Sequence, residues 1–163
     1  MNALARPYRD LLAYQLAETR RWHAWLAERP HALALRIGEG AVRDLAAHVA
    51  VVDLAYVQRL RGMAVTQQDP QAITPWSEVG ALAERAAALL DDWLLAATPA
   101  EFARVLCFRG MTAQPLMVTA RDVVMHVLLH GARHWAQIAA FLRQQGLPQD
   151  WPHDYLLRTP VPE

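Results

Sequence analysis

The sequence predicts an all-α protein, a four-helix bundle formed by a single domain that spans residues 1–163. Hydrophobic residues make up 54% of the chain and charged residues 20%, which excludes a disordered chain and fits a compact helical one. Four segments repeat their apolar residues at helical spacing, and a long connection separates the second from the third. The length is that of one domain with its own core.

The first two predicted helices cover residues 9–28 and 42–60. The first ends before Pro30, because a residue that precedes proline disfavours the helical conformation. The second has Gly62 as its stop. The apolar stripes of the two helices consist of Leu11, Leu12, Leu16, Trp22, Trp25 and Leu26, and of Leu45, Val49, Val52, Tyr56 and Leu60.

The third predicted helix starts at Thr74-Pro75 and continues to about Ala97. A capping threonine followed by a proline at the first helical position is a favourable start. Between residues 101 and 118 the helical pattern weakens. There, the segment 104–110 is expected to be a short strand, a hairpin arm or an irregular connection.

The fourth predicted helix has the clearest boundaries. Thr119 caps it, Asp122 completes a capping box, and the helix continues to Gln145 before Gly146 ends it. Its length of about 39 Å is enough to cross the whole domain. Residues 150–163 are expected to wrap around the bundle with at most a short helix.

Three histidines on this fourth helix, His126, His130 and His134, are spaced four residues apart. Successive side chains therefore stay on one face, about 6 Å apart along the axis. Two neutral imidazoles at this spacing can share one metal ion, whereas three in a row rarely do, because the end pair lies about 12 Å apart. The spacing is equally compatible with ordinary histidines on a half-buried face.

A third ligand is expected from another helix, and His48 in the second helix is the natural candidate. Two histidines from one helix and one from another would leave a coordination position open for water or substrate, as in catalytic sites. The remaining histidines lie at segment ends or in the tail, where a solvated side chain is the favoured interpretation. These are His23, His31 and His153.

Three further residues have both a structural and a chemical interpretation. Asp44 and Asp122 each precede a histidine by four residues and could orient it, but a charge that stabilises the helix N-terminus is favoured for both. The lone cysteine, Cys107, lies in an apolar stretch, and a buried structural thiol is favoured over a nucleophile.

Composition and missing motifs exclude several functions. The 16 basic and 16 acidic residues balance, which argues against a nucleic-acid partner, and no apolar run is long enough to cross a membrane. A single cysteine and an N-terminus without a signal peptide fit the cytoplasm. The absence of lysine excludes Schiff-base chemistry, and no metalloprotease, nucleophile-elbow or P-loop motif occurs. Trp22 and Trp25, close together in the first helix, permit a homodimer.

The run HVLLHGARHWAQI of residues 126–138, followed by LRQQG at residues 142–146, resembles the hallmark of the DinB/YfiT-like family. The resemblance covers essentially the whole chain and includes Tyr14, His48, Asp154 and Tyr155. It implies a down-up-up-down bundle with a long crossover between the second and third helices. It also implies a divalent metal ion, typically zinc or nickel, on His48, His130 and His134, with His126 as a neighbour.

Family members of known activity use low-molecular-weight thiols: they are bacillithiol or glutathione S-transferases and mycothiol-dependent maleylpyruvate isomerase. The resemblance therefore implies a metal-dependent transferase that joins such a thiol to a small electrophile. Its alternatives are a non-catalytic metal-binding stress-response bundle and a metal-dependent hydrolase or isomerase. The family's arginine after the last histidine is replaced by Trp135. Arg109 and Arg133 are candidates to bind a carboxylate of the thiol, although a solvated arginine is favoured for each.

Overall fold

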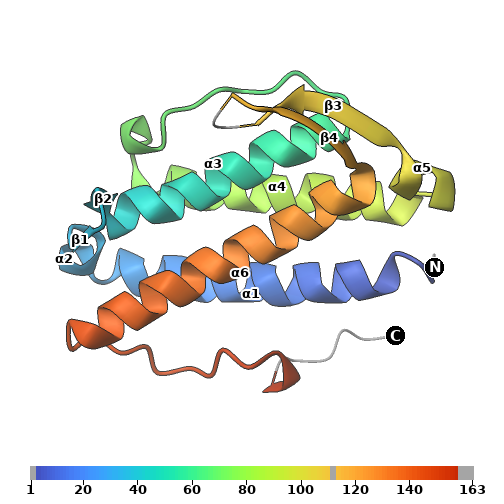
Figure 1. Cartoon of the computed structure of the whole chain (residues 1–163). Helices are drawn as coiled ribbons and strands as arrows, with labels where there is room; N and C mark the ends of the chain where they lie inside the picture. Colours follow the sequence, from blue (N-terminus) through green and yellow to red (C-terminus); the bar gives the residue numbers. More distant parts are fainter. Residues whose placement is uncertain (1–2, 111–112, 158–163) are drawn as a thin grey trace.

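The computed structural model describes residues 3–110 and 113–157, where four long helices form a bundle (Figure 1). They are α1 (Arg6–Ala27), α3 (Val42–Leu60), α4 (Trp76–Ala96) and α6 (Ala120–Gln144). The all-α prediction is confirmed. Shorter elements connect or follow these helices: α2 (Pro30–Leu33), β1 (Arg36–Ile37), β2 (Gly40–Ala41), η1 (Pro70–Ala72), α5 (Pro99–Ala103), β3 (Val105–Arg109), β4 (Pro115–Thr119) and η2 (Tyr155–Leu157).

The directions of the helices follow from Figure 1, in which α1 and α6 run one way and α3 and α4 the other. Two ion pairs hold α1 antiparallel to α4: Arg9 with Asp91 near one end, and Arg20 with Glu84 further along. Because α3 and α4 are parallel, residues 61–75 must return along the bundle before α4 can begin, and Figure 1 shows them doing so.

Capping interactions encoded in the local sequence fix the N-termini of α6 and α3, the two helices that carry His48, His130 and His134. At α6, the hydroxyl of Thr119 accepts from the amide of Asp122, and the Asp122 carboxylate accepts from the amide of Thr119, so the predicted capping box is present. At α3, the carboxylate of Asp44 accepts from the amide of Ala41. Both acids stabilise a helix start, as predicted.

Two predicted helix starts are shifted. The first helix begins at Arg6 rather than at residue 9, since a proline is tolerated in the first turn of a helix. The third begins at Trp76, because Pro75 keeps an extended backbone and is the capping position instead of the first helical residue.

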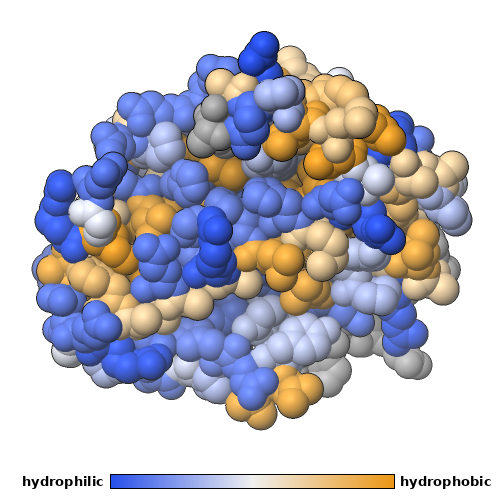
Figure 2. Space-filling view, viewed as in Figure 1, coloured by the Kyte–Doolittle hydropathy of each residue, from blue (hydrophilic) through white to orange (hydrophobic). Residues whose placement is uncertain are grey.

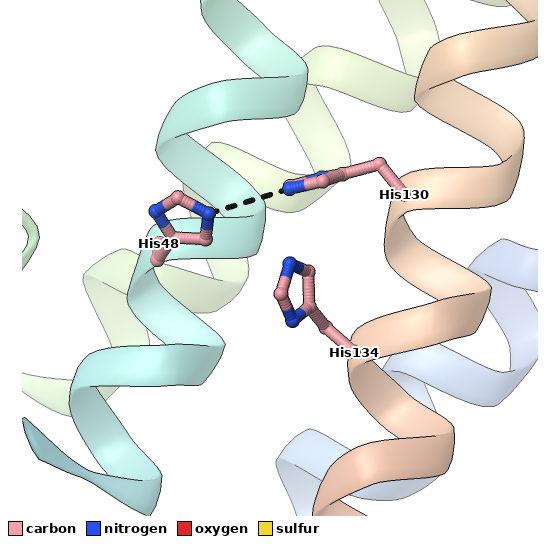
Figure 3. Close-up of side chains that lie close together, drawn as sticks. All are labelled: His48, His130 and His134. Carbon is pink, nitrogen blue, oxygen red and sulfur yellow. Dashed lines mark hydrogen bonds between the residues drawn. The ribbon is translucent and has the colours of Figure 1, made fainter. Parts of the chain in front are cut away.

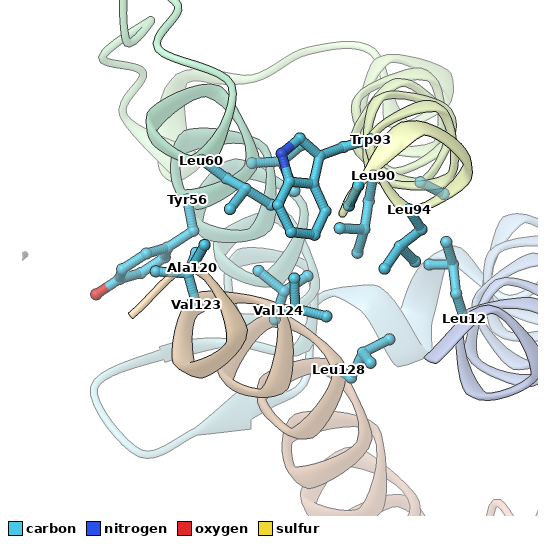
Figure 4. Packing of buried hydrophobic residues seen from close by; sticks show 14 of the residues in the cluster. Leu12, Tyr56, Leu60, Leu90, Trp93, Leu94, Ala120, Val123, Val124 and Leu128 are labelled. Atoms are coloured by element: carbon cyan, nitrogen blue, oxygen red, sulfur yellow. The ribbon is translucent and has the colours of Figure 1, made fainter. Parts of the chain in front are cut away.

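The core fills the space between all four long helices. Toward the end of the bundle where α4 finishes, apolar side chains from each helix interlock, as Figure 4 shows: Leu12 from α1, Tyr56 and Leu60 from α3, Leu90, Trp93 and Leu94 from α4, and Ala120, Val123, Val124 and Leu128 from α6. A second cluster surrounds Trp22, which is 0% exposed. Trp22 is therefore a core residue and cannot contribute to a dimer surface.

Residues 101–118, where the helical pattern weakens, include the end of the short helix α5 and most of the antiparallel hairpin of β3 and β4; residues 111–112 lie outside the described residues. Side chains alternate along β3, so Phe108 packs inward and Cys107 is exposed. The prediction of a buried thiol is thus wrong, because the period of two places neighbouring residues on opposite faces. Met117 and Val105 are also exposed, and Figure 2 shows apolar side chains gathered near the hairpin.

The tail after α6 passes back along the bundle, as predicted, and contains only the short η2 among its described residues (Figure 1). Two side chains attach it to a buried carboxylate of α1: Trp151 Nε1 and His153 Nδ1 lie 3.2 and 2.6 Å from Glu18 Oε2. Tyr14 donates its hydroxyl to the carbonyl of His153. His153 therefore attaches the tail to α1, and the prediction that it is solvated is wrong.

None of the described helices combines the length and the apolar character that spanning a membrane would require.

Candidate metal centre

Three imidazoles from two helices converge between α3 and α6 (Figure 3). His48 extends from α3, and His130 and His134 extend from successive turns of α6. One ring nitrogen of each lies within 4.8 Å of the other two, and Nε2 of His48 is 3.3 Å from Nε2 of His130. The structure thus brings together the three residues that the resemblance implies, in a group that could hold a metal ion.

The helices fix these positions through their own packing. On α6, a separation of four residues keeps His130 and His134 on the face that packs against α3, and both are buried, at 6% and 9% exposed. His48 lies on the flank of the buried face of α3 and is less buried than the other two. The group therefore depends on the packing of α3 against α6.

The far ring nitrogen of each α6 histidine has an acceptor beside it. Nδ1 of His130 is 2.9 Å from Oδ1 of Asp53, and Nδ1 of His134 is 3.2 Å from Oε1 of Gln137. An oxygen acceptor at Nδ1 favours the tautomer that carries its hydrogen there, which leaves the lone pair on Nε2. Outer acceptors that orient imidazoles in this way are typical of metal sites.

Burial sets the charge state of the three rings. It lowers the pKa of His48 and of His130 to about 4, and it also lowers the pKa of His134. The imidazoles are consequently neutral near pH 7, the form in which they can donate a lone pair to a metal ion. Burial raises the pKa of the Asp53 carboxyl well above its usual range.

The other histidines lie apart from this group. His126 is exposed and stacks on His130 with ring centroids 5.5 Å apart, but it does not belong to the convergent set. His31 is exposed, as predicted. His23 packs against the ring of Trp76 at 4.5 Å, and burial lowers its pKa to about 4, so the prediction that it is solvated is wrong.

Sequence reasoning missed the roles of Asp53 and Gln137. Asp53 is the one charged residue within the apolar run of residues 49–57. An acid in such a run indicates that it has a buried polar partner. Gln137 lies three residues after His134, a distance at which side chains on one helix face meet.

The two candidate arginines and Trp135 are placed very differently. Arg133 approaches the histidines, with Nη2 3.0 Å from Nε2 of His134. Arg109 bonds to the carbonyl of Ala113 at the end of the hairpin. Trp135 is 4% exposed and stacks on Trp22, so the residue that replaces the family's arginine has become part of the core.

The donor set suits a first-row divalent ion. Imidazole nitrogen is a common ligand of zinc, copper, iron and nickel, while magnesium and calcium prefer oxygen. Three convergent nitrogens, two of them on rings with an oxygen acceptor at the far nitrogen, match the ligand preference of such an ion. The fold and the site together define a helical bundle with a three-histidine group that could hold a metal.

The chain belongs to the DinB family, whose model matches residues 1–160. Two similar solved structures are a DinB-like protein of Bacillus subtilis and a DinB family member of Shewanella denitrificans. The first has a TM-score of 0.56 at 13% identity and covers 87% of this chain and 95% of its own. The second has a TM-score of 0.56 at 19% identity and covers 98% and 92%. No curated protein matches the chain.

Proposed function

We propose that His48, His130 and His134 bind a divalent metal ion, zinc or nickel, and that the protein is a transferase that joins a low-molecular-weight thiol to a small electrophile. The observation that carries the metal site is the convergence of three buried or half-buried imidazole nitrogens within 4.8 Å. The thiol chemistry is supported by membership of the DinB family together with the sequence resemblance described above.

The residues of this chain have separable tasks in the proposal. Asp53 and Gln137 hold the rings of His130 and His134 in the tautomer that directs Nε2 inward. Burial keeps the imidazoles neutral and excludes competing water. When bound, a divalent ion supplies Lewis acidity, which lowers the pKa of a thiol and increases the thiolate fraction near neutral pH.

A hydrolase on the same site would need a carboxylate free to accept a proton from water. Among the described residues, the carboxylate hydrogen-bonded to the histidine group is that of Asp53, whose Oδ1 is engaged with His130. This favours the thiol transferase. Low-molecular-weight thiols are kept reduced in the cytoplasm, and the proposal includes that location.

The metal site is tested by elemental analysis of the purified protein. Wild type is expected to retain about one divalent ion per chain, and His130→Ala to lose it, because ligand loss weakens binding by at least about 100-fold. His126→Ala is the matched control, since it removes a neighbouring imidazole outside the group and should keep the ion. Stoichiometric metal in His130→Ala would contradict the ligand set.

The reaction is tested by following thiol consumption with bacillithiol, mycothiol and glutathione and a panel of small electrophiles. These assays need a Cys107→Ser background, because the exposed Cys107 thiol would itself consume electrophile. Metal-dependent turnover with one of these thiols would support the transferase. A fully metal-loaded protein without turnover across the panel would favour a non-catalytic metal-binding bundle, the competing function.

A further inference from the structure

A positive charge lies beside the three histidines, and no acid of the part of the chain that the structure describes pairs with it. Arg133 precedes His134 on α6, is exposed at the surface, and lies with Nη2 3.0 Å from Nε2 of His134. Among the described residues, none of the ion pairs within 4.0 Å involves Arg133. The other described side chains of this cluster are the imidazoles, the amide of Gln137 and the carboxyl of Asp53, which is engaged with His130.

We propose that Arg133 recognises a carboxylate on the molecule that binds next to the metal ion, so that the site selects carboxylate-bearing thiols or electrophiles. This inference rests on the proposed metal site. The guanidinium carries several N–H donors in a planar fork that matches the two oxygens of a carboxylate.

Arg133 would become available to a ligand carboxylate because its guanidinium and a metal ion compete for the same lone pair of His134. The Nε2 atom of His134 has a single lone pair, and it cannot both accept from Arg133 and bind a metal ion. A metal ion bound to Nε2 of His134 would therefore free the guanidinium, which would remain close to the site. A cation beside a second cation is unfavourable unless an anion lies between them, and a ligand carboxylate would satisfy both charges.

The charge of Arg133 already acts on the whole cluster. After burial, it is among the causes that lower the pKa of His48, His126, His130 and His134. The same charge would attract an anionic group held among these imidazoles.

The test compares two thiols that differ in one charge, mercaptoacetate and the neutral mercaptoacetamide. Their binding is measured by calorimetry on nickel-loaded protein in the Cys107→Ser background. We expect this protein to bind mercaptoacetate at least about tenfold more tightly than mercaptoacetamide, as a charged hydrogen bond would give. Arg133→Gln should bind the two about equally, and Arg133→Lys should retain part of the preference, since lysine keeps the charge without the fork.

A second readout does not depend on the thiol. Because Arg133 competes for the His134 lone pair, Arg133→Gln should bind nickel alone more tightly than wild type, by about 5-fold or more. Arg143→Gln, an exposed arginine in the last turn of the same helix, is the control and should change neither measurement.

The possible results distinguish the role of Arg133 from the proposed metal site. Loss of the carboxylate preference in Arg133→Gln, with tighter nickel binding, would support the role of Arg133. An undiminished preference in Arg133→Gln would overturn it while leaving the metal site intact. Failure of wild type to bind nickel, or nickel binding that survives His130→Ala, would overturn the proposed function itself and this inference with it.

Discussion

Asp53 on α3 and His130 on α6 are joined across the helix interface, with Oδ1 2.9 Å from Nδ1. Burial acts on the two groups in opposite directions: it lowers the pKa of His130 to about 4 and raises that of Asp53 well above its usual range. The side chain of His130 is 4% exposed, so water cannot replace the contact. The pair therefore fixes the ring of His130 before any ligand arrives.

Replacing Asp53 should weaken metal binding more than it weakens the fold. In Asp53→Asn, the amide oxygen can still accept from Nδ1, but the group can no longer ionise beside a bound cation, and we expect a loss of about 10-fold in metal affinity. Asp53→Ala removes the acceptor and should lose about 100-fold. The measurement is a competitive zinc or nickel titration of each variant. Asp92→Asn, an exposed acid of α4, is the control, and an equal loss there would remove the orienting role from Asp53.

Stability without metal should fall as the pH drops from about 6.5 to about 4. Burial lowers the pKa of His23, His48 and His130 to about 4 in the folded chain, so in this window the unfolded chain binds protons that the folded chain does not. Asp53 opposes the trend, since its raised pKa makes the folded chain hold an extra proton. Three histidines outweigh one acid, and the net loss between pH 7 and pH 5 is roughly 2–4 kcal/mol.

Urea unfolding of metal-free protein at the two pH values measures this loss. His23→Gln removes one of the three groups and should reduce the pH dependence, whereas His31→Gln changes an exposed histidine and should leave it as in wild type. Stability that does not fall between pH 7 and pH 5 would contradict the lowered pKa values of these three histidines.

Sequence patterns predicted the elements that follow a single periodicity. The capping box at Thr119 and the bounds of α3 depend on neighbours along the chain and were found as predicted. The stripe of α1 was found in part, since its buried face also includes the polar residues Gln15 and Glu18. Cys107 was misplaced because composition alone cannot show on which face of a hairpin a residue lies. The pattern at residues 104–110 was compatible with both a strand and an irregular connection.

For the candidate site too, the sequence predicted the features that lie within one helix better than the contacts between helices. The spacing of His130 and His134 within one helix is visible in the sequence, but the approach of His48 depends on the packing of α3 against α6. The contact of Asp53 with His130 crosses the same interface and joins residues 77 positions apart. No local pattern encodes such a distance, although an isolated acid in an apolar helix is a signal that a buried partner exists.

Trp135 is expected to be essential for the core rather than for chemistry. Its ring stacks on Trp22 at 5.6 Å and 4°, and its Nε1 donates to the hydroxyl of Thr19. Trp135→Ala should cost about 3–5 kcal/mol, as expected for a large buried aromatic residue. Trp135→Phe keeps much of the packing and should cost about 1–2 kcal/mol, mainly through the lost hydrogen bond. Denaturant unfolding measures both, and metal content per folded chain should be unchanged.

Gly131 and Gln15 form a tight crossing between α6 and α1. A Cβ atom on Gly131 would lie 2.3 Å from Nε2 of Gln15, so Gly131→Ala requires the buried glutamine to move. Alanine is favoured over glycine inside a helix by about 1 kcal/mol, and we expect the displaced amide to cancel that gain.

The cancellation is tested by a double-mutant cycle. In a Gln15→Ala background the obstacle is gone, and adding Gly131→Ala should then stabilise the protein by about 0.5–1 kcal/mol, measured by urea unfolding. The coupling energy between the two sites is the difference between the effects of Gly131→Ala in the two backgrounds. If Gly131→Ala stabilises the wild-type chain as much as the Gln15→Ala chain, the coupling is zero and the close approach does not constrain α6. A positive coupling would show that this glycine sets how closely α1 approaches the helix that carries His130 and His134.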